Sequence, residues 1–234
     1  MPASAGWIRL KGGTLMQYRN ERETVVRYCR MMLSAGLTTG SGGNISIRLA
    51  DDAFAISPTG IDYAAMEATD VCMVDAAGKV VEGGRLPSSE LPMHLALYRA
   101  RSDARAVVHT HSPYATTFAC LRETIPPVHY LVGFAGTHVP LADYATYGTD
   151  ALAENAIRAM GQDFNAVLLA NHGLLALGAS LEHAYATAEE IELVARIAFQ
   201  ARAIGTPVHL DDDEMLRVIE KFKTYGSQNP QEEG

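Results

Sequence analysis

The stretch Val107-Val108-His109-Thr110-His111-Ser112-Pro113 sets two histidines, one residue apart, at the end of an apolar run. An extended strand turns residues i and i+2 to the same face, so the two imidazoles should project side by side. Two neutral imidazoles at a rigid strand end suit a divalent transition metal, most often zinc. Two separate, hydrogen-bonded histidines would leave the same short pattern, so the rest of the chain must decide between these interpretations.

Three further residues are candidates to complete a metal shell around this pair. His172 stands in an Asn-His-Gly turn between two apolar runs, and Glu90 lies in the first turn of a predicted helix. Three imidazoles and one carboxylate make a complete shell for Zn²⁺, with the carboxylate as the most exchangeable ligand. His94 is a rival, since it lies four residues after Glu90 on the same helix face, but the neighbouring apolar residues favour a position beside the packed stripe. The other four histidines are predicted to be solvated or hydrogen-bonded in place: His129, His138, His183 and His209.

Composition excludes several classes of partner. The 234 residues are 48% hydrophobic and 20% charged, with a net charge of −8, and Lys and Arg form no dense cluster. Nucleic acid and membrane are therefore not expected as partners. Cys29, Cys72 and Cys120 are odd in number and far apart, so neither a disulfide framework nor a thiolate zinc site is indicated and a reducing, cytoplasmic setting is expected.

The chain reads as one domain with short extensions. No apolar run reaches the roughly 18 residues of a membrane span, and residues 1–15 lack the apolar core of a signal peptide. We interpret residues 1–15 as a disordered N-terminal extension, residues 16–226 as a single catalytic domain, and residues 227–234 as a polar C-terminal tail.

Helical periodicity alternates with closely joined pairs of short strands. A helix should begin at Asn20, which with Glu23 resembles a capping box, and should end before Gly36. Further helices are expected at 88–101, 113–121, 150–160, 181–204 and 211–222, and strands at 45–49, 53–57, 71–74, 79–81, 106–110, 137–141, 166–170 and 174–177. Strand pairs joined this closely leave no room for crossovers, so we predict a three-layer α/β/α domain with a mostly antiparallel central sheet.

Two segments could bind an anion. The glycine-rich loop that ends at Gly43-Asn44 feeds a strand and exposes backbone N–H groups. Ser88 and Ser89 precede a predicted helix, whose free N–H groups suit a phosphate. A flexible turn and a simple helix cap are the structural alternatives.

Five motifs occur in a fixed order along the chain: Gly43-Asn44, Ser57-Pro58-Thr59-Gly60, Pro87-Ser88-Ser89-Glu90, His109-Thr110-His111 and Asn171-His172-Gly173. In this order and at these separations they resemble the class II aldolase/adducin family, over about residues 16–225. Segments 125–130, 144–149 and 220–226 resemble most the members that cleave L-fuculose 1-phosphate. The resemblance implies a zinc-dependent aldolase that reversibly cleaves a ketose 1-phosphate of this type to dihydroxyacetone phosphate and an aldehyde.

The resemblance also implies roles for individual residues. It implies metal ligands at Glu90, His109, His111 and His172, with Zn²⁺ or another divalent transition metal as the cofactor. It implies a phosphate site that comprises Gly43, Asn44, Thr59, Gly60, Ser88 and Ser89. Tyr130 matches a proton donor that reaches in from a neighbouring subunit of a homotetramer, and Tyr225 matches a tyrosine on the C-terminal tail. Tyr147, near the aldehyde pocket, replaces a phenylalanine of the family.

Glu90 would serve as the base, because substrate would displace it from the metal and free it to move a proton. A lysine Schiff base is the rival mechanism, but Lys11, Lys79, Lys221 and Lys223 all lie in extension, turn or surface-helix contexts. Pentulose-phosphate 4-epimerases, which typically carry Asp in place of Glu90, methylthioribulose-phosphate dehydratases, other deoxyketose-phosphate aldolases and the non-catalytic adducin head are the alternatives within the family.

Overall fold

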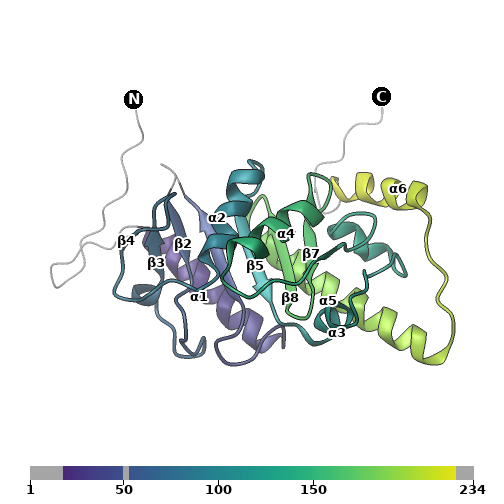
Figure 1. Cartoon of the computed structure of the whole chain (residues 1–234), viewed down its shortest axis with the longest axis horizontal. Coiled ribbons are helices and arrows are strands. Elements are labelled where there is room, and N and C mark those ends of the chain that lie inside the picture. The colour runs from purple at the N-terminus through teal and green to yellow at the C-terminus, as the bar shows by residue number, and fades with distance from the viewer. Residues whose placement is uncertain (1–17, 50–52, 225–234) are drawn as a thin grey trace.

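The computed structural model describes residues 18–49 and 53–224 (Figure 1). Its strands are β1 (Asn44–Arg48), β2 (Phe54–Ile56), β3 (Cys72–Val74), β4 (Val80–Glu82), β5 (Ala106–Thr110), β6 (Leu141–Ala142), β7 (Ala166–Leu169) and β8 (Gly173–Gly178). Its α-helices are α1 (Arg19–Ser34), α2 (Leu91–Ala100), α3 (Pro113–Leu121), α4 (Asp150–Met160), α5 (Leu181–Ile204) and α6 (Asp212–Phe222). Two 3₁₀ helices, η2 (Ala68–Asp70) and η3 (Tyr130–Phe134), complete the described elements.

The strands form one sheet in the order β4-β3-β2-β1-β5-β8-β7-β6. Short connections join β1 to β2, β3 to β4 and β7 to β8 as antiparallel hairpins. Within the described residues, β6 and β7 make the one parallel pair. The central strand β5 pairs antiparallel with β1 on one side and with β8 on the other, which brings distant parts of the chain together in the middle of the sheet.

Helices cover both faces of this sheet. Alternate strand residues divide between two hydrophobic clusters, so that Val108 packs with α1, α3 and α5 while Val107 packs with α2 and α4. This alternation is the two-residue period of a strand that is buried on both faces. The predicted three-layer α/β/α fold with a mostly antiparallel sheet is confirmed.

Local corrections concern the ends of elements. Asn20 does not cap α1, because the helix already begins at Arg19 and Glu23 pairs with Arg19 at 2.7 Å. The helix predicted from residue 88 begins only at Leu91, since Pro87 bridges to Pro58 in an extended conformation. The strand predicted over 137–141 is reduced to β6 and a bridge at Val139. The predicted extension 1–15 and tail 227–234 lie outside the described residues.

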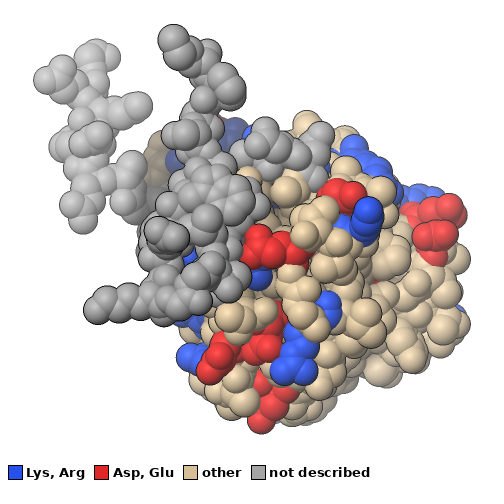
Figure 2. Space-filling model, turned by 90° about the vertical axis from the view of Figure 1, so that its left-hand side faces the viewer, with Lys and Arg blue, Asp and Glu red and all other residues tan. Residues whose placement is uncertain are grey.

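The surface carries charges of both signs. Figure 2 shows Lys and Arg interspersed with Asp and Glu on the face that is turned toward the viewer. None of the helices formed by residues 18–49 and 53–224 combines the length and hydropathy that crossing a bilayer requires.

Candidate metal centre and active site

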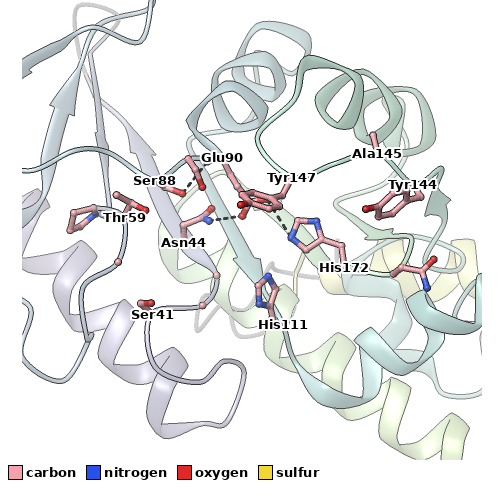
Figure 3. Close-up of a pocket in the computed structure, with 16 residues that line it drawn as sticks. Ser41, Asn44, Thr59, Ser88, Glu90, His111, Tyr144, Ala145, Tyr147 and His172 are labelled. Atoms are coloured by element: carbon pink, nitrogen blue, oxygen red, sulfur yellow. Dashed lines mark hydrogen bonds and ion pairs between the residues drawn. The ribbon is translucent and has the colours of Figure 1, made fainter.

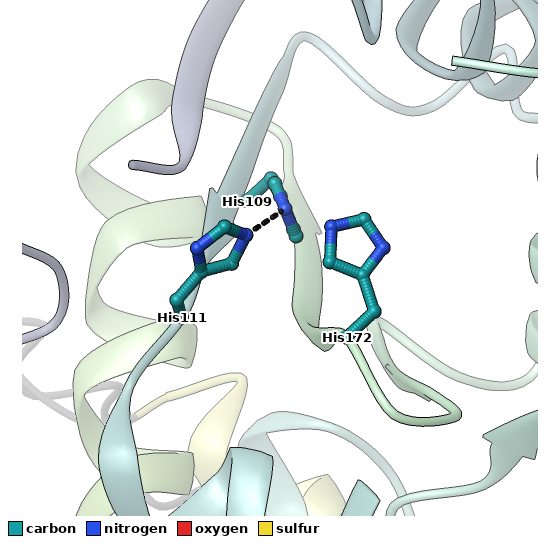
Figure 4. Close-up of side chains that lie close together, drawn as sticks. All are labelled: His109, His111 and His172. Atoms are coloured by element: carbon teal, nitrogen blue, oxygen red, sulfur yellow. Dashed lines mark hydrogen bonds between the residues drawn. The ribbon is translucent and has the colours of Figure 1, made fainter. Parts of the chain in front are cut away.

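The end of β5 and the chain directly after it bring two imidazoles together, as the alternation at this strand predicts. His109 is fully buried, whereas His111 is exposed, and their Nε2 atoms are 3.0 Å apart (Figure 4). The Nδ1 atom of His109 lies 2.9 Å from the carbonyl oxygen of Leu174 on β8. Because a carbonyl can only accept, this contact assigns the ring proton to Nδ1 and leaves the Nε2 lone pair facing the other imidazole.

The β7–β8 turn supplies the third imidazole. Asn171 takes a left-handed conformation, with φ of 53°, and its side-chain oxygen accepts a hydrogen bond from Arg122 at 3.0 Å. Gly173 follows where no side chain fits, since a Cβ there would lie 2.3 Å from the carbonyl oxygen of Thr110 and 3.1 Å from the ring of His111. The turn therefore presses His172 against the other two rings, and the ligand atoms of all three lie within 4.8 Å of one another.

Glu90 closes this cluster from the helix side of the sheet. It is the residue before α2 and is only 5% exposed. One carboxylate oxygen, Oε2, lies 3.1 Å from Nε2 of His109, and the other, Oε1, lies 3.4 Å from Nε2 of His172. Oε1 has no hydrogen-bond partner.

Burial and mutual charge set the protonation of these groups. Partial burial of the rings and, second to it, the charge on the neighbouring His109 together lower the pKa of both His111 and His172 to about 4. Burial alone would raise the pKa of Glu90, but His109 and His172 outweigh it and hold that pKa well below the usual range. Burial acts to lower the pKa of His109, and the adjoining Glu90 carboxylate reverses this and raises it.

These groups fit a divalent metal ion. Two neutral imidazoles, a third with Nδ1 committed to a carbonyl, and an ionised carboxylate offer three nitrogen ligands and one oxygen ligand, which is a common zinc donor set. The buried, unpartnered Oε1 of Glu90 is an orphan polar atom that a cation at this point would satisfy. A group of three histidines and one acid is thus preorganised for a metal, and its donor types do not by themselves distinguish zinc from other transition metals.

We call the group formed by His109, His111, His172 and Glu90 the metal cluster. A cavity of about 390 Å³ opens over it (Figure 3). The lining includes His111, His172, Glu90 and the predicted phosphate residues Gly43, Asn44, Thr59, Gly60, Ser88 and Ser89. Figure 3 shows Thr59 and Ser88 at one side of this pocket and Tyr144 at the opposite side. Hydroxyl groups and glycine-rich backbone thus lie at one end of the pocket and the ring of Tyr144 lies at the other, with Tyr147 between them in this view.

Gly43 explains why the glycine-rich loop can lie so close to the strand. Its φ is 66°, and a Cβ at this position would lie 2.4 Å from the carbonyl oxygen of His109. Only glycine combines this left-handed conformation with so close an approach. The loop is thereby held against β5, with Asn44 opposite His109 in the β1–β5 register.

Sequence reasoning missed some of the pocket. Tyr147 was predicted as a site residue, and it lines the pocket. Other lining residues on the Tyr147 loop, on the glycine-rich loop, beside Thr59 and in the turn before β8 were not predicted as site residues. These additional lining residues are Ser41, Gly42, Pro58, Tyr144, Ala145 and Asn171. Each lies within three residues of a predicted site residue, so extending the candidates along the same loops would have found them.

Two predicted residues do not meet the cluster in this chain. Tyr130 begins η3, is 48% exposed, contacts the rings of His129 and Phe222, and is absent from the lining of the pocket. Tyr225 lies outside the described residues. A catalytic role for Tyr130 therefore requires a second protomer.

The rival ligand His94 lies behind the cluster. It is fully buried, and both ring nitrogens are engaged, Nδ1 with Ser46 at 2.6 Å and Nε2 with Asn44 at 2.5 Å. It has no nitrogen left for a metal.

The chain resembles known proteins in both sequence and structure. Residues 23–199 match the class II aldolase and adducin N-terminal domain. The chain is 49% identical over 214 residues to a 5-deoxy-D-ribulose 1-phosphate aldolase of Bacillus thuringiensis, covering 91% of this chain and 100% of that protein. It is 41% identical over 204 residues to an L-fuculose phosphate aldolase of Escherichia coli K12, covering 86% of this chain and 94% of the relative.

A solved structure of an L-fuculose 1-phosphate aldolase superposes with a TM-score of 0.85 at 45% identity, and the match covers 89% of this chain and 98% of the other. Similarity in sequence and similarity in three dimensions thus point to the same family. The chain belongs to the class II aldolase and adducin family, as one of its aldolases.

Proposed function

We propose that this aldolase cleaves a ketose 1-phosphate reversibly to dihydroxyacetone phosphate and an aldehyde. In this proposal Glu90, His109, His111 and His172 hold a divalent metal ion, which is Zn²⁺ or another divalent transition metal. The observation that carries the proposal is the convergence of three imidazoles and one buried carboxylate at the floor of a pocket with a hydroxyl-rich end. A cation in such a site polarises a carbonyl and stabilises the negative charge that develops on oxygen when a carbon–carbon bond breaks.

The hydroxyl-rich end of the pocket suits the phosphate. Thr59, Ser88 and Ser89 offer hydroxyl groups, and Gly43 and Gly60 let backbone N–H groups approach a ligand closely. Asn44 lies between this end and Glu90, to which it donates a hydrogen bond at 2.8 Å. A substrate anchored here by its phosphate would extend its carbon chain over the metal cluster toward Tyr144 and Tyr147.

Glu90 is the base of the proposal. Cleavage of the C3–C4 bond leaves the electron pair on the three-carbon fragment, and Glu90 delivers the proton to C3; in the reverse direction it removes that proton from the hydroxymethyl carbon of dihydroxyacetone phosphate. The carboxylate suits the removal of this proton because it is ionised, buried and free at Oε1. In the cleavage direction it must first take up a proton from solvent, which balances the proton that leaves the C4 hydroxyl.

Tyr130 of a neighbouring protomer would take the proton from the C4 hydroxyl as the aldehyde forms, and would return it during synthesis. Its exposure and its distance from the lining of its own pocket support a role in trans. The proposal therefore includes self-association, as a homotetramer with the site between subunits, and a possible contribution from Tyr225 of the tail.

Two substrates are the leading candidates. L-fuculose 1-phosphate is named for one group of relatives, and 5-deoxy-D-ribulose 1-phosphate is named for the Bacillus relative at 49% identity. Cleavage at C3–C4 gives lactaldehyde from the first and acetaldehyde from the second, so both aldehydes end in a methyl group. The end of the pocket at Tyr144, opposite the hydroxyl groups, suits such an apolar terminus.

A panel assay tests the proposal. Purified protein is given both ketose 1-phosphates and a pentulose 5-phosphate, with the metal content measured in parallel, and release of dihydroxyacetone phosphate is followed. We expect metal-dependent release from a ketose 1-phosphate. Epimerised or dehydrated product without free dihydroxyacetone phosphate, or a metal-free protein with no activity after reloading, would favour the other members of the family instead.

The role of Glu90 has its own test. In Glu90→Gln, exchange of the hydroxymethyl proton of dihydroxyacetone phosphate with solvent should fall about 100-fold or more, since a general base contributes about 10² to 10⁴ in rate. Exchange at the rate of the unmodified protein in a metal-loaded Glu90→Gln variant would exclude Glu90 as the base.

A further inference from the structure

A row of buried polar groups runs from Glu90 away from the pocket. Residues 90, 94 and 98 lie at i, i+4 and i+8, which places Glu90, His94 and Tyr98 on one side of α2 and its first turn. Asn44 and Ser46 lie at i and i+2 on β1, on the strand face that this side of the helix covers. All five are at most 5% exposed.

Each neighbour in this row is within hydrogen-bond distance of the next. Asn44 Nδ2 lies 2.8 Å from Glu90 Oε2, and His94 Nε2 lies 2.5 Å from Asn44 Oδ1. Ser46 Oγ lies 2.6 Å from His94 Nδ1, and the Tyr98 hydroxyl lies 2.9 Å from Ser46 Oγ and 3.0 Å from the Ser46 carbonyl oxygen. The row is therefore continuous from the Tyr98 hydroxyl to the Glu90 carboxylate.

The chemistry of the groups fixes the direction of the bonds from Glu90 to the Ser46 hydroxyl. The carboxylate of Glu90 only accepts, so Asn44 must donate from Nδ2 and accept at Oδ1. His94 must then carry its proton on Nε2, and its Nδ1 must accept from the Ser46 hydroxyl. Burial lowers the pKa of His94 to about 3, which agrees with a neutral ring. The opposite tautomer would turn the amide of Asn44 and set its oxygen against the carboxylate.

We propose that His94 is a positioning residue, which fixes the amide of Asn44 and through it the carboxylate of Glu90. The proposal rests on the proposed function, in which Glu90 holds the metal and moves a proton. Because Asn44 holds Oε2, the two oxygens of Glu90 are no longer equivalent: Oε2 is anchored, and Oε1 is the atom left free beside His172.

The first test needs neither metal nor substrate. In metal-free protein labelled with ¹⁵N-histidine, nitrogen chemical shifts and couplings report which ring nitrogen carries the proton, and the spectrum of His94→Gln identifies the His94 signal. We expect a neutral ring protonated at Nε2. A ring protonated at Nδ1, or a charged ring at pH 7, would overturn the proposal whatever the reaction of the protein is.

The second test is kinetic. His94→Leu removes the donor, and we expect the turnover number for hydroxymethyl proton exchange to fall about 10- to 100-fold, the usual effect of removing a group that orients a metal ligand, with a smaller change in KM. His94→Gln keeps an N–H group that can reach Asn44, so it should restore most of the rate. Equal losses in both variants would contradict the proposal.

A double-mutant cycle separates positioning from packing. If His94 acts through Asn44, the variant that combines His94→Leu with Asn44→Ala should lose no more turnover than Asn44→Ala alone, whereas multiplied losses would show that His94 acts by another route. Leu97→Ala is the matched control, since Leu97 is buried on the same helix and has no polar side-chain atom. It should lose stability and keep the exchange rate per folded molecule.

These outcomes distinguish a failure of the proposed function from a failure of the proposed role of His94. If Glu90→Gln exchanges the proton at the rate of the unmodified protein, the proposed base is wrong, and the ¹⁵N result for His94 still stands by itself. If Glu90→Gln is impaired while His94→Leu is not, the proposed function stands and the positioning role is wrong.

Discussion

Gly173 shows how closely single residues are constrained around the metal cluster. A methyl group there would collide with the Thr110 carbonyl and press on the rings of His109 and His111. We predict that Gly173→Ala destabilises the protein by about 2 kcal/mol through overpacking and weakens metal binding about 10-fold or more by shifting a ligand. Thermal unfolding and a zinc-chelator competition measure the two effects.

Gly205 provides the control, because a Cβ there meets no atom within 4 Å and its backbone is extended, with φ of 179°. Gly205→Ala should change neither stability nor metal affinity. Equal metal affinity in Gly173→Ala and in the unmodified protein would show that the histidines do not depend on this close approach.

The three cysteines differ in burial, and this sets their reactivity. Cys120 is exposed, whereas Cys29 and Cys72 are buried, and burial raises the pKa of both buried thiols, that of Cys72 to about 11. We predict that an alkylating reagent at pH 8 modifies Cys120 alone in the folded protein, as mass spectrometry would show. Modification of Cys72 in folded protein, or a reacting thiol in Cys120→Ser, would contradict this.

The raised pKa of Cys72 also links stability to pH. The thiol is neutral in the folded protein up to a higher pH than in the unfolded chain, so its contribution to stability is complete below about pH 9 and is lost as the pH rises toward about 11. We predict that the difference in unfolding free energy between the unmodified protein and Cys72→Ala shrinks by about 2 kcal/mol over this range. A difference independent of pH would show that burial does not hold this thiol neutral.

At the scale of an element, Glu192 ties α5 to the start of α3. Its carboxylate oxygens accept hydrogen bonds from the backbone N–H groups of Tyr114 and Ala115, at 2.9 and 2.8 Å. These are free donors of the first turn, and α3 begins two residues after His111. We predict that Glu192→Ala lowers the unfolding free energy by about 1 to 2 kcal/mol, as loss of a helix cap does, and weakens metal binding through His111.

Glu189 lies on the same helix and is exposed, so Glu189→Ala is the matched control. Denaturant titration and chelator competition on both variants test the prediction. If Glu192→Ala and Glu189→Ala behave alike, the contact does not stabilise α3 or position the histidine.

Most elements could be predicted because their residues carry local signals. The alternation of the two histidines indicated the strand β5, and the tight turn before Gly173 indicated the pairing of β7 with β8. Ser180 and Gly205 mark the two ends of α5, as expected. The start of α2 was wrong, since the Ser88 hydroxyl bonds the N–H of Glu90 in a turn ahead of the helix, which local sequence does not distinguish from a cap. The tertiary contact that decides this is the pairing of residues 87–88 with residues 57–58, in which the Ser88 N–H donates to the Ser57 carbonyl oxygen at 3.1 Å.

The candidate site likewise combines residues that local sequence indicates with residues that only the packing of distant elements brings together. The proposed ligands His109, His111 and His172 were indicated by histidine spacing and turn position, which are local. The role of His94 does not, because its partners Asn44 and Ser46 lie about 50 residues away and are brought close only by the packing of α2 on β1. The same holds for Tyr144, whose side chain reaches the pocket through the course of a long loop.

At the scale of the whole molecule, each site of the proposed tetramer uses residues of two protomers, so two inactive variants should complement each other. Glu90→Gln and Tyr130→Phe should each be nearly inactive in aldol cleavage. When equal amounts are unfolded together and refolded, about a quarter of the sites in a cyclic assembly would combine an intact Glu90 with an intact Tyr130 from the neighbour. We predict that activity returns to about that fraction.

Each variant refolded alone is the control, and light scattering gives the assembly size. Recovery in the mixture requires that two protomers build one site. A mixture no more active than its separate components, with normal assembly, would place the proton donor within a single chain or exclude Tyr130.

The order of strands has a consequence for how the protein is made. The metal cluster draws on the end of β5 and on the β7–β8 turn, two neighbours in the sheet that are separated in the chain by α3, η3 and α4. On the ribosome, the first pair of imidazoles emerges well before the third, and hairpin β7–β8 must dock against β5 before all three converge. If the cluster holds a metal ion as proposed, tight capture of the ion is a late step of biosynthesis, and chains that end before this hairpin would compete poorly with finished ones for a scarce metal.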